Sequence, residues 1–437
     1  MAVNTTTALV DSLKRSYPDE FFEVHLNTNA PFFMNVIKGS KLKSWRQDGE
    51  GIYWPFNLQS PQSMGTPAEG GGLPTPRTRV EVQGRLRVGQ FIGDFEISFL
   101  LEAIADNDRA GWGAAVKRSV KENTSDLTKH VNRLYAGTHG TGRIGQVNAA
   151  TSAVTTFVGK LPLGVLLMRP NMEIAIYDDD TGSGAAEDTS EVISKIVQST
   201  RTVTVGNAQT LDANDHIYIA GSYGAATVPN GIAGIVDDAT NLTTIHNVSR
   251  ATYEELKSLV LTNSGTVRDL SEDLMLEAAH GVRQRSGRLV DCVLMNTGQW
   301  SKYCKMVRPD RQYVVSGKGV PNYDTGYKAS TEYEPVSQFM HGGKVADIYV
   351  SEDVSPRTVY MLTKSELRRV EQGPPTWIDW GGGSIFQQSV STTYQTAKTA
   401  TIAYFGNIGS PCPAAHARID DLADKELCGA AVGGPDT

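Results

Sequence analysis

The 437-residue sequence has few of the features that mark secreted, membrane-spanning or metal-binding proteins. Its four cysteines, Cys292, Cys304, Cys412 and Cys428, show neither C-x-x-C spacing nor a histidine at zinc-ligand spacing. A disulfide framework and a zinc site are therefore not expected. There is no run of about 18 apolar residues, and the N-terminus lacks the apolar core of a signal peptide. We expect a soluble, intracellular protein that does not contact a membrane.

Motifs of catalysis and cofactor binding are also missing. The sequence contains no H-E-x-x-H, no G-x-S-x-G and no Walker-type phosphate loop. Residues 140–145 match G-x-G-x-x-G, but a helical pattern precedes them where a dinucleotide site requires a strand, so we interpret them as a flexible connection. Residues 178–180 form an Asp triplet without the ligand spacing of a calcium loop, which favours a solvated turn. We expect no catalytic residues, no cofactor, no metal and no enzymatic activity.

The charge balance argues against tight nucleic-acid binding. The formal net charge is -7, whereas proteins that grip nucleic acid usually carry a basic excess. This balance is compatible with a protein that merely encloses nucleic acid. The 43 glycines predict many turns and long loops rather than a helical bundle.

The strongest local pattern is a long amphipathic helix over residues 110–135. Asn107 or Asp108 stands at the N-cap position and Gly137 follows the C-terminus. A shorter helix is predicted over 97–107. At about 1.5 Å per residue the long helix measures roughly 40 Å, which is typical of a scaffold element. Its apolar stripe consists of Trp112, Val116, Val120, Leu127, Val131, and Leu134 or Tyr135. We expect the first three of these to pack on strands around residues 393–405.

Two segments before this helix have little of their own to pack against. Residues 1–40 are predicted to form an arm that contains a short helix over 7–14 and four phenylalanines, Phe21, Phe22, Phe32 and Phe33. This arm either folds back on its own core or lies along a neighbouring subunit. Residues 41–95 predict a two-stranded ribbon around a Gly/Pro-rich tip. A lone ribbon is marginally stable in water, so a partner subunit is the natural cover.

Arginines line one limb of that ribbon: Arg77, Arg79, Arg85 and Arg87. Such a run is either a solvated face or a set of bidentate partners for carboxylates of another subunit.

The remaining chain alternates between strand-rich and mixed segments. Residues 137–159 are interpreted as a loop, and three strand groups between 165 and 224 predict a small β-barrel or sandwich. A mixed α/β region follows, with helices over 249–261, 269–284 and 297–307 and a buried strand over 289–295. A long loop covers 312–336. Strands dominate from 367 to 409, and the last residues form a tail.

This order of elements resembles the major capsid proteins of tailed double-stranded DNA phages, the Hong Kong 97-type fold family, whose fold encapsulin shells share. Residues 27–39 (NTNAPFFMNVIKG) are similar to the family's N-arm, and 85–98 (RLRVGQFIGDFEIS) to the return of its extended E-loop. Residues 230–256 are similar to the start of its axial domain, and 399–409 (TATIAYFGNIG) to its closing peripheral strand.

The resemblance implies an α+β fold with seven parts. These are an N-arm (1–40), an E-loop (41–95), a peripheral domain with a spine helix (96–149), a β-rich insertion (150–240), an axial domain (241–362), closing peripheral strands (363–418) and a tail (419–437).

It also implies a shell protein that forms pentamers and hexamers of an icosahedral head, located in the virion and assembled in the host cytoplasm. The head would enclose packaged double-stranded DNA without sequence-specific binding. Further implied partners are decoration, portal and separate scaffolding proteins. The phenylalanines and arginines named above are the expected inter-subunit contacts. Two alternatives stay open: an encapsulin-type compartment and, more remotely, an α/β enzyme with a β accessory domain.

Overall fold

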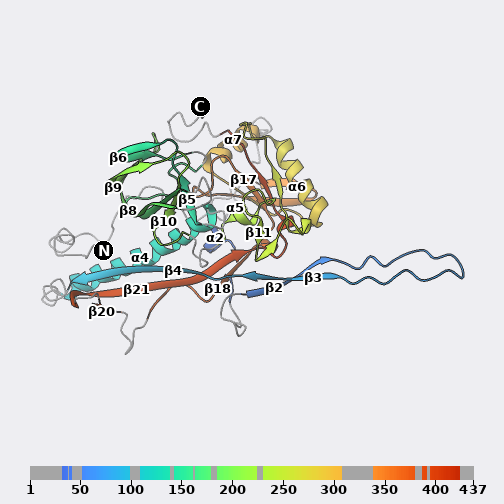
Figure 1. Ribbon diagram of the computed structural model, residues 1–437, viewed down its shortest axis with the longest axis horizontal. Helices are drawn as coiled ribbons and strands as arrows, with labels where there is room; N and C mark the ends of the chain where they lie inside the picture. The colour runs from blue at the N-terminus through green and yellow to red at the C-terminus, as the bar shows by residue number, and fades with distance from the viewer. Residues whose placement is uncertain are drawn as a thin grey trace, which may run out of the picture.

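The computed structural model describes residues 32–37, 39–41, 52–98, 109–137, 142–160, 163–178, 185–223, 230–307, 338–378, 386–390 and 394–423. These residues form three six-stranded sheets, a long helix and a ribbon that projects far from the body (Figure 1).

The first sheet is built around β21 (Tyr394–Gly409). β4 (Gly89–Ser98) pairs antiparallel with it along the whole length of β4. The closing strand predicted over 399–409 is confirmed and begins earlier than expected. The other strands of this sheet are β18 (Arg368–Glu371), β19 (Thr376–Trp377), β20 (Phe386–Val390) and β1 (Gly39–Lys41), which runs parallel to β18.

The long helix α4 (Arg109–Gly137) lies along this sheet (Figure 1). Its 29 residues agree with the predicted helix to within two residues at either end. In its second half the predicted stripe is buried: Leu127, Val131, Leu134 and Tyr135. The Tyr135 ring packs edge-on against Phe91 of β4, with centroids 6.0 Å apart. The expected packing of Trp112, Val116 and Val120 lies outside the described side chains.

The shorter helix predicted over 97–107 is wrong at its start. Ile97 and Ser98 are the last residues of β4, where they pair with Lys398 and Ala397. Pairing with the long β21 strand prevails there over the local helical pattern. Residues 99–108 lie outside the described residues.

The second sheet has the strand order β5-β10-β7-β8-β9-β6. A bridge between Val147 and Gly159 joins its first strand to its last. Beside this bridge the Lys160 amide donates to the Gln146 carbonyl at 2.8 Å, so the sheet curls back on itself. The strands are β5 (Arg143–Gln146), β6 (Thr151–Val158), β7 (Glu173–Asp178), β8 (Ala185–Val197), β9 (Thr202–Leu211) and β10 (His216–Ile219).

The prediction of a loop over 137–159 is therefore wrong. β6 is mostly exposed and rich in threonine, so it shows no alternation of apolar and polar residues. Its pairing with β9 makes it a strand. The glycine motif contributes to β5: a Cβ atom on Gly145 would lie 2.5 Å from the Met168 methyl group. This glycine permits close packing against Met168.

The third sheet has the order β13-β22-β17-β14-β16-β15 and packs with two helices, α6 (Glu272–Ser286) and α7 (Thr297–Val307). Both helices were predicted. The Ser271 hydroxyl caps α6 by accepting from the Leu274 amide, and Gly287 ends it with a φ of 69°. The strands are β13 (Leu259–Leu261), β14 (Cys292–Met295), β15 (Gln338–His341), β16 (Lys344–Val350), β17 (Val359–Leu362) and β22 (Ala417–Ile419).

The helix predicted over 249–261 is wrong. This segment contains only a 3-10 turn, η1 (Glu254–Leu256), and then β13, which pairs in parallel with β22. Its charged side chains fall at helical spacing, but sheet pairing determines its conformation. The long loop predicted over 312–336 lies outside the described residues.

Candidate functional site: the projecting ribbon and its root

The ribbon consists of β2 (Ile52–Gln59) and β3 (Val80–Leu86), which pair antiparallel from Ile52–Leu86 to Gln59–Val80. Residues 60–79 continue beyond these strands as an extended tip (Figure 1). Nearly all tip side chains are exposed, including two large apolar ones, Met64 at 90% and Leu73 at 89%. The tip therefore contributes little to the core of its own chain.

The root of the ribbon is held by aromatic packing. Trp54 and Phe56 lie on the face of β2 that turns toward the body, and both contact His246. The Trp54 and His246 rings meet edge-on at 5.1 Å, and the Phe56 ring stacks on His246 at 6.1 Å. Opposite Trp54 stands Gly84, where a Cβ atom would lie 2.1 Å from the Phe56 ring. Only glycine fits at this position.

His246 belongs to a tight hairpin between β11 (Thr244–Ile245) and β12 (Val248–Ser249). Both turn residues, His246 and Asn247, have positive φ, at 48° and 64°, as a two-residue type I′ turn requires. The His246 carbonyl accepts the Arg85 amide of the ribbon at 2.7 Å. The turn is thus bonded directly to β3.

The imidazole of His246 is neutral. It is buried, and burial lowers its pKa to about 3. Its Nε2 atom accepts the Ser410 amide at 3.3 Å, which places the proton on Nδ1. The ring thereby joins the ribbon root to the end of β21 as an apolar contact with one oriented hydrogen bond.

A second anchor lies where the chain leaves the ribbon. The side-chain Nδ2 of Asn407, on β21, donates to the Arg87 backbone carbonyl at 2.5 Å. The side-chain Oδ1 of Asn407 accepts from the Asn230 backbone amide at 2.9 Å. One side chain therefore links the ribbon, the first sheet and the segment before α5 (Ile232–Ile235).

A buried ion network lies beside the hairpin that contacts the ribbon root. Arg250 is completely buried and donates to the carbonyls of Leu242, Gly234 and Ile235 at 2.7–2.9 Å. Its charge is balanced by Asp237 at 3.6 Å, which also pairs with Arg418 at 3.4 Å. Burial lowers the pKa of Arg250 to about 10, which leaves it charged at neutral pH. This network fixes the loop from which the His246 turn projects.

The arginines expected at an inter-subunit surface all lie on the ribbon. Arg77, Arg79 and Arg87 are exposed, and Arg79 pairs along its own strand with Glu81 at 2.9 Å. Arg85 is half-buried, with its guanidinium carbon 6.0 Å from the centre of the Tyr53 ring.

The phenylalanines divide differently. Phe32 and Phe33, in the short helix α2 (Phe32–Asn35), are fully buried in the chain's own core. Phe33 also donates its amide to the Asn132 side chain at 2.9 Å. The arm folds back on its own core at these two residues, which is one of the two arrangements that the sequence left open, because α4 offers an apolar site. Phe21 and Phe22 lie outside the described residues.

The root residues Trp54, Phe56, His246 and Asn407 were not anticipated. Trp54 and Phe56 alternate on one strand face, which is a readable signal of burial. The role of His246 depends on a turn that contacts a strand about 160 residues away in sequence. No local pattern carries that information.

Other kinds of site find no support in the described part of the chain. No group of three or more His, Cys, Asp or Glu side chains there is arranged to hold a metal ion. None of its helices is long and apolar enough to cross a membrane. Cys292 is buried, and burial raises the pKa of its thiol well above the ordinary range.

Comparison with solved structures identifies the fold. The chain superposes on the capsid asymmetric unit of cyanophage A-1(L) with a TM-score of 0.52 and 11% identity, covering 96% of this chain and 98% of that one. A structure from Mycobacterium phage Bobi gives a TM-score of 0.46 at 8% identity, over 96% and 99% of the two chains. The capsid of a native GTA particle gives 0.47 at 8%, over 97% and 100%. No protein-family model and no curated protein sequence matches the chain.

The cyanophage superposition spans nearly the whole of both chains. The chain therefore has the α+β Hong Kong 97-type fold that the order of its elements predicted.

Proposed function

We propose that this chain is the major capsid protein of a tailed phage or a related particle, a shell subunit that assembles into pentamers and hexamers of an icosahedral head. The observation that carries this proposal is the near-complete superposition on a phage capsid subunit. The function is structural: the protein acts by binding copies of itself in the virion and encloses packaged double-stranded DNA.

Finer assignments are also part of this proposal, and the order of the elements along the chain supports them. α4 serves as the spine helix of the peripheral domain, and the ribbon serves as the E-loop. The curled sheet of β5–β10 is the barrel-like insertion, and the third sheet with α6 and α7 is the axial domain. The seven-part division from residue 1 to residue 437 remains part of this proposal.

The exposed tip supports assembly through the ribbon. A two-stranded ribbon gains stability only when a third surface covers it, and this tip extends away from its own body. Met64 and Leu73 would become buried on a neighbouring subunit. Arg77 and Arg87 would meet that neighbour's carboxylates.

Shell cohesion in this proposal is non-covalent. No lysine lies between Lys43 and Lys117, so the ribbon cannot supply the lysine of an isopeptide bond. Many modest contacts repeated around a closed shell give high collective stability, and a decoration protein could add to them. Portal and scaffolding proteins are further proposed partners.

The net charge of -7 suits an enclosing wall. A strongly basic wall would hold the phosphate backbone and oppose packaging and release. We therefore propose that the protein contacts DNA without sequence preference.

Electron microscopy of the purified protein, with a deletion in the ribbon tip, tests this function. Wild-type protein should form closed particles. Replacing residues 60–76 with Asn-Gly should abolish or deform them, while circular dichroism and the melting temperature of the subunit stay unchanged. If the deletion variant forms normal particles, the ribbon tip is not required for assembly. Small oligomers from wild-type protein under all conditions would contradict the shell function. Enzyme cargo in place of nucleic acid inside purified particles would favour an encapsulin.

A further inference from the structure

β6 is an end strand of the second sheet that lacks the usual protection against pairing with another chain. It pairs with β9 on one side, and it lies on the side of the body away from α6 (Figure 1). From residue 144 to residue 159 the sequence contains no charged residue and no proline. Charges and proline are among the features that normally keep an edge strand from recruiting a further strand.

Other edges of the described sheets are protected by their length or their charge. The end strands of the third sheet, β13 and β15, span only three and four residues. β4, which pairs with β21 alone among the described strands, carries the carboxylates Asp94 and Glu96. β6 has eight residues, and residues 152–156 are all exposed. β6 therefore combines length, exposure and lack of charge.

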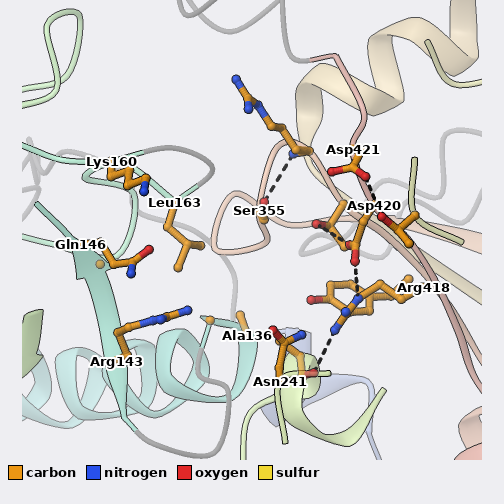
Figure 2. A pocket seen from close by; sticks show the side chains of 17 residues that line it. Ala136, Arg143, Gln146, Lys160, Leu163, Asn241, Ser355, Arg418, Asp420 and Asp421 are labelled. Carbon is orange, nitrogen blue, oxygen red and sulfur yellow. Dashed lines mark hydrogen bonds and ion pairs between the residues drawn. The ribbon is translucent and has the colours of Figure 1, made fainter. Parts of the chain in front are cut away.

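One end of the β6 edge is closed by the chain that follows β5. The Val158 carbonyl accepts the Asn148 amide at 2.8 Å, and the Lys160 amide donates to the Gln146 carbonyl at 2.8 Å. Gln146 and Lys160 also line a cavity of about 310 Å³ between this end and the third sheet (Figure 2). This end of β6 is therefore already occupied by the chain itself.

The rest of the edge is open. The Gly159 amide donates to the Arg201 carbonyl on the β9 side, whereas the Val158 carbonyl points to the opposite side, so the backbone direction alternates along the strand. Followed back along β6, this alternation directs the backbone groups of Thr156 and Val154 to the open edge. No described strand pairs with them there.

We propose that the open edge of β6 pairs with the same edge of a second copy of this chain, antiparallel about a twofold axis at Thr155. In this register Val154 of one copy exchanges both backbone hydrogen bonds with Thr156 of the other, and the axis repeats the exchange. The two Thr155 side chains face each other as a non-hydrogen-bonded pair, in which threonine hydroxyls bond across the strands.

The composition of the edge favours a copy of itself as the occupant. Antiparallel self-pairing sets residues of one strand opposite residues of the same strand, and opposed like charges destabilise such a pair. β6 has no charge to be opposed, and the nearest one, Lys160, would stand beyond the paired segment, opposite Ala150. A strand that carries charges would find no counter-ion on β6.

The contact is short, so a single pair is weak. Stable interfaces bury about 1,200–2,000 Å² in total, far more than a few paired residues supply. The unassembled subunit should therefore dimerise only weakly through β6. In the proposed shell the same contact would be repeated and reinforced by others. Because it can form between free subunits, the contact goes beyond the proposed function and does not rest on it.

Disulfide trapping tests the contact on the full-length protein. Thr155→Cys places two thiols across the axis, because the Cα atoms of such a pair lie about 4.5 Å apart, within the reach of a disulfide. With diamide as the oxidant, non-reducing electrophoresis should show a dimer that a reductant removes. Val192→Cys, at an exposed position on the interior strand β8, is the matched control and should run as a monomer, as should the wild type.

A pair of substitutions at Thr156 separates pairing from folding. Thr156→Pro removes the amide that faces the open edge and leaves the bonds to β9 in place. Analytical ultracentrifugation of the unassembled subunit should show a dimer dissociation constant at least tenfold higher than that of the wild type. Thr156→Val keeps the amide and should dimerise as the wild type does. If Thr156→Pro fails to fold by circular dichroism, the Thr155→Cys trap still decides the question.

The outcomes separate this contact from the shell function. The proposal is overturned if Thr155→Cys forms no more dimer than Val192→Cys, or if it is linked to a different polypeptide in purified particles. Particles that assemble normally without the Thr155→Cys dimer would remove this contact and leave the proposed function standing. A trapped dimer of a protein that never forms particles would support the contact and contradict the shell function.

Discussion

Beyond Gln59 the ribbon has almost no neighbours among the described residues of its own chain, whereas the body around Arg250 is filled with buried polar groups that satisfy one another. The ribbon presents backbone, arginines and two apolar side chains to the exterior. The body contains an arginine whose hydrogen-bonding groups meet carbonyls or Asp237. Both are parts of one fold, yet substitutions in them should affect different properties.

The junction between these regions explains how they coexist. The ribbon root is packed like a core, with Trp54 and Phe56 against His246, whereas the tip over residues 60–79 is open. A subunit organised in this way can fold before assembly and still offer a large unused surface. Body substitutions should lower subunit stability, and tip substitutions should lower assembly alone.

The largest loss of subunit stability is expected for Arg250→Met. The change removes one of the two arginines that pair with Asp237 and leaves several buried carbonyls without their donor, and breaking a buried ion pair costs about 3–5 kcal/mol. Urea denaturation of the unassembled subunit measures the loss. Arg77→Met, the same change on the exposed ribbon, should alter the free energy of unfolding by less than about 0.5 kcal/mol. If the two changes lower the free energy of unfolding equally, the body and the ribbon do not differ in their contribution to subunit stability.

Phe56→Ala should come next, at about 3 kcal/mol, because it opens a cavity beside His246 and Gly84. The matched change at the tip is Leu73→Ala, whose side chain is 89% exposed. It should leave the urea midpoint unchanged and reduce particle yield. A stable Phe56→Ala subunit would mean that the root is not packed as described.

The titration of Asp215 predicts how the stability of the body depends on pH. Desolvation and the nearby carboxylates of Asp212, Glu187 and Asp178 raise its pKa to about 6, although the Asp212 amide donates to it. Since the folded state holds this proton more tightly than the unfolded state, its contribution to stability falls as pH rises from about 4 to 6 and is constant above.

Asp215→Asn should therefore stabilise the subunit at pH 7 by roughly 1 kcal/mol, and by less at pH 4.5. Only the difference between variant and wild type isolates this effect. The buried His130, His246 and His416 have pKa values lowered mainly by burial and oppose the trend, since they destabilise the fold as pH falls. A variant-minus-wild-type difference that does not change with pH would contradict the assignment.

The smallest effect on the subunit is expected for Arg79→Glu. The Arg79–Glu81 pair is 60% and 47% exposed, and such pairs contribute less than about 1 kcal/mol. Assembly, followed by light scattering, should weaken far more. Arg79→Lys retains the charge and should have a milder effect. Equal loss of folding and assembly in Arg79→Glu would make this arginine an intrasubunit residue.

The sequence predicted the elements whose pattern is local. The periodicity of α4, the caps of α6 and the ribbon with its Gly/Pro tip were readable because each depends on neighbours a few residues away. β6 and β13 were missed because pairing with distant strands makes them strands. For Phe32 and Phe33 the sequence left two arrangements open, because nothing local reveals that α4 receives them. The His246 contact was invisible for the same reason.

The pairing of β4 with β21 has a mechanical consequence. β3 passes into β4 through Arg87 and Val88 alone, and β4 is then bonded along its length to the longest strand of the described fold. A small rotation of the ribbon about the His246 turn therefore produces a much larger displacement of the tip. The ribbon's reach from Leu86 to the tip near Gly70 is roughly 50 Å at about 3.3 Å per residue. A tilt of about 5° at the root would move the tip by about 4 Å, close to one strand spacing. In the proposed shell, such a tilt would let subunits of pentamers and hexamers accommodate different curvature with almost the same body.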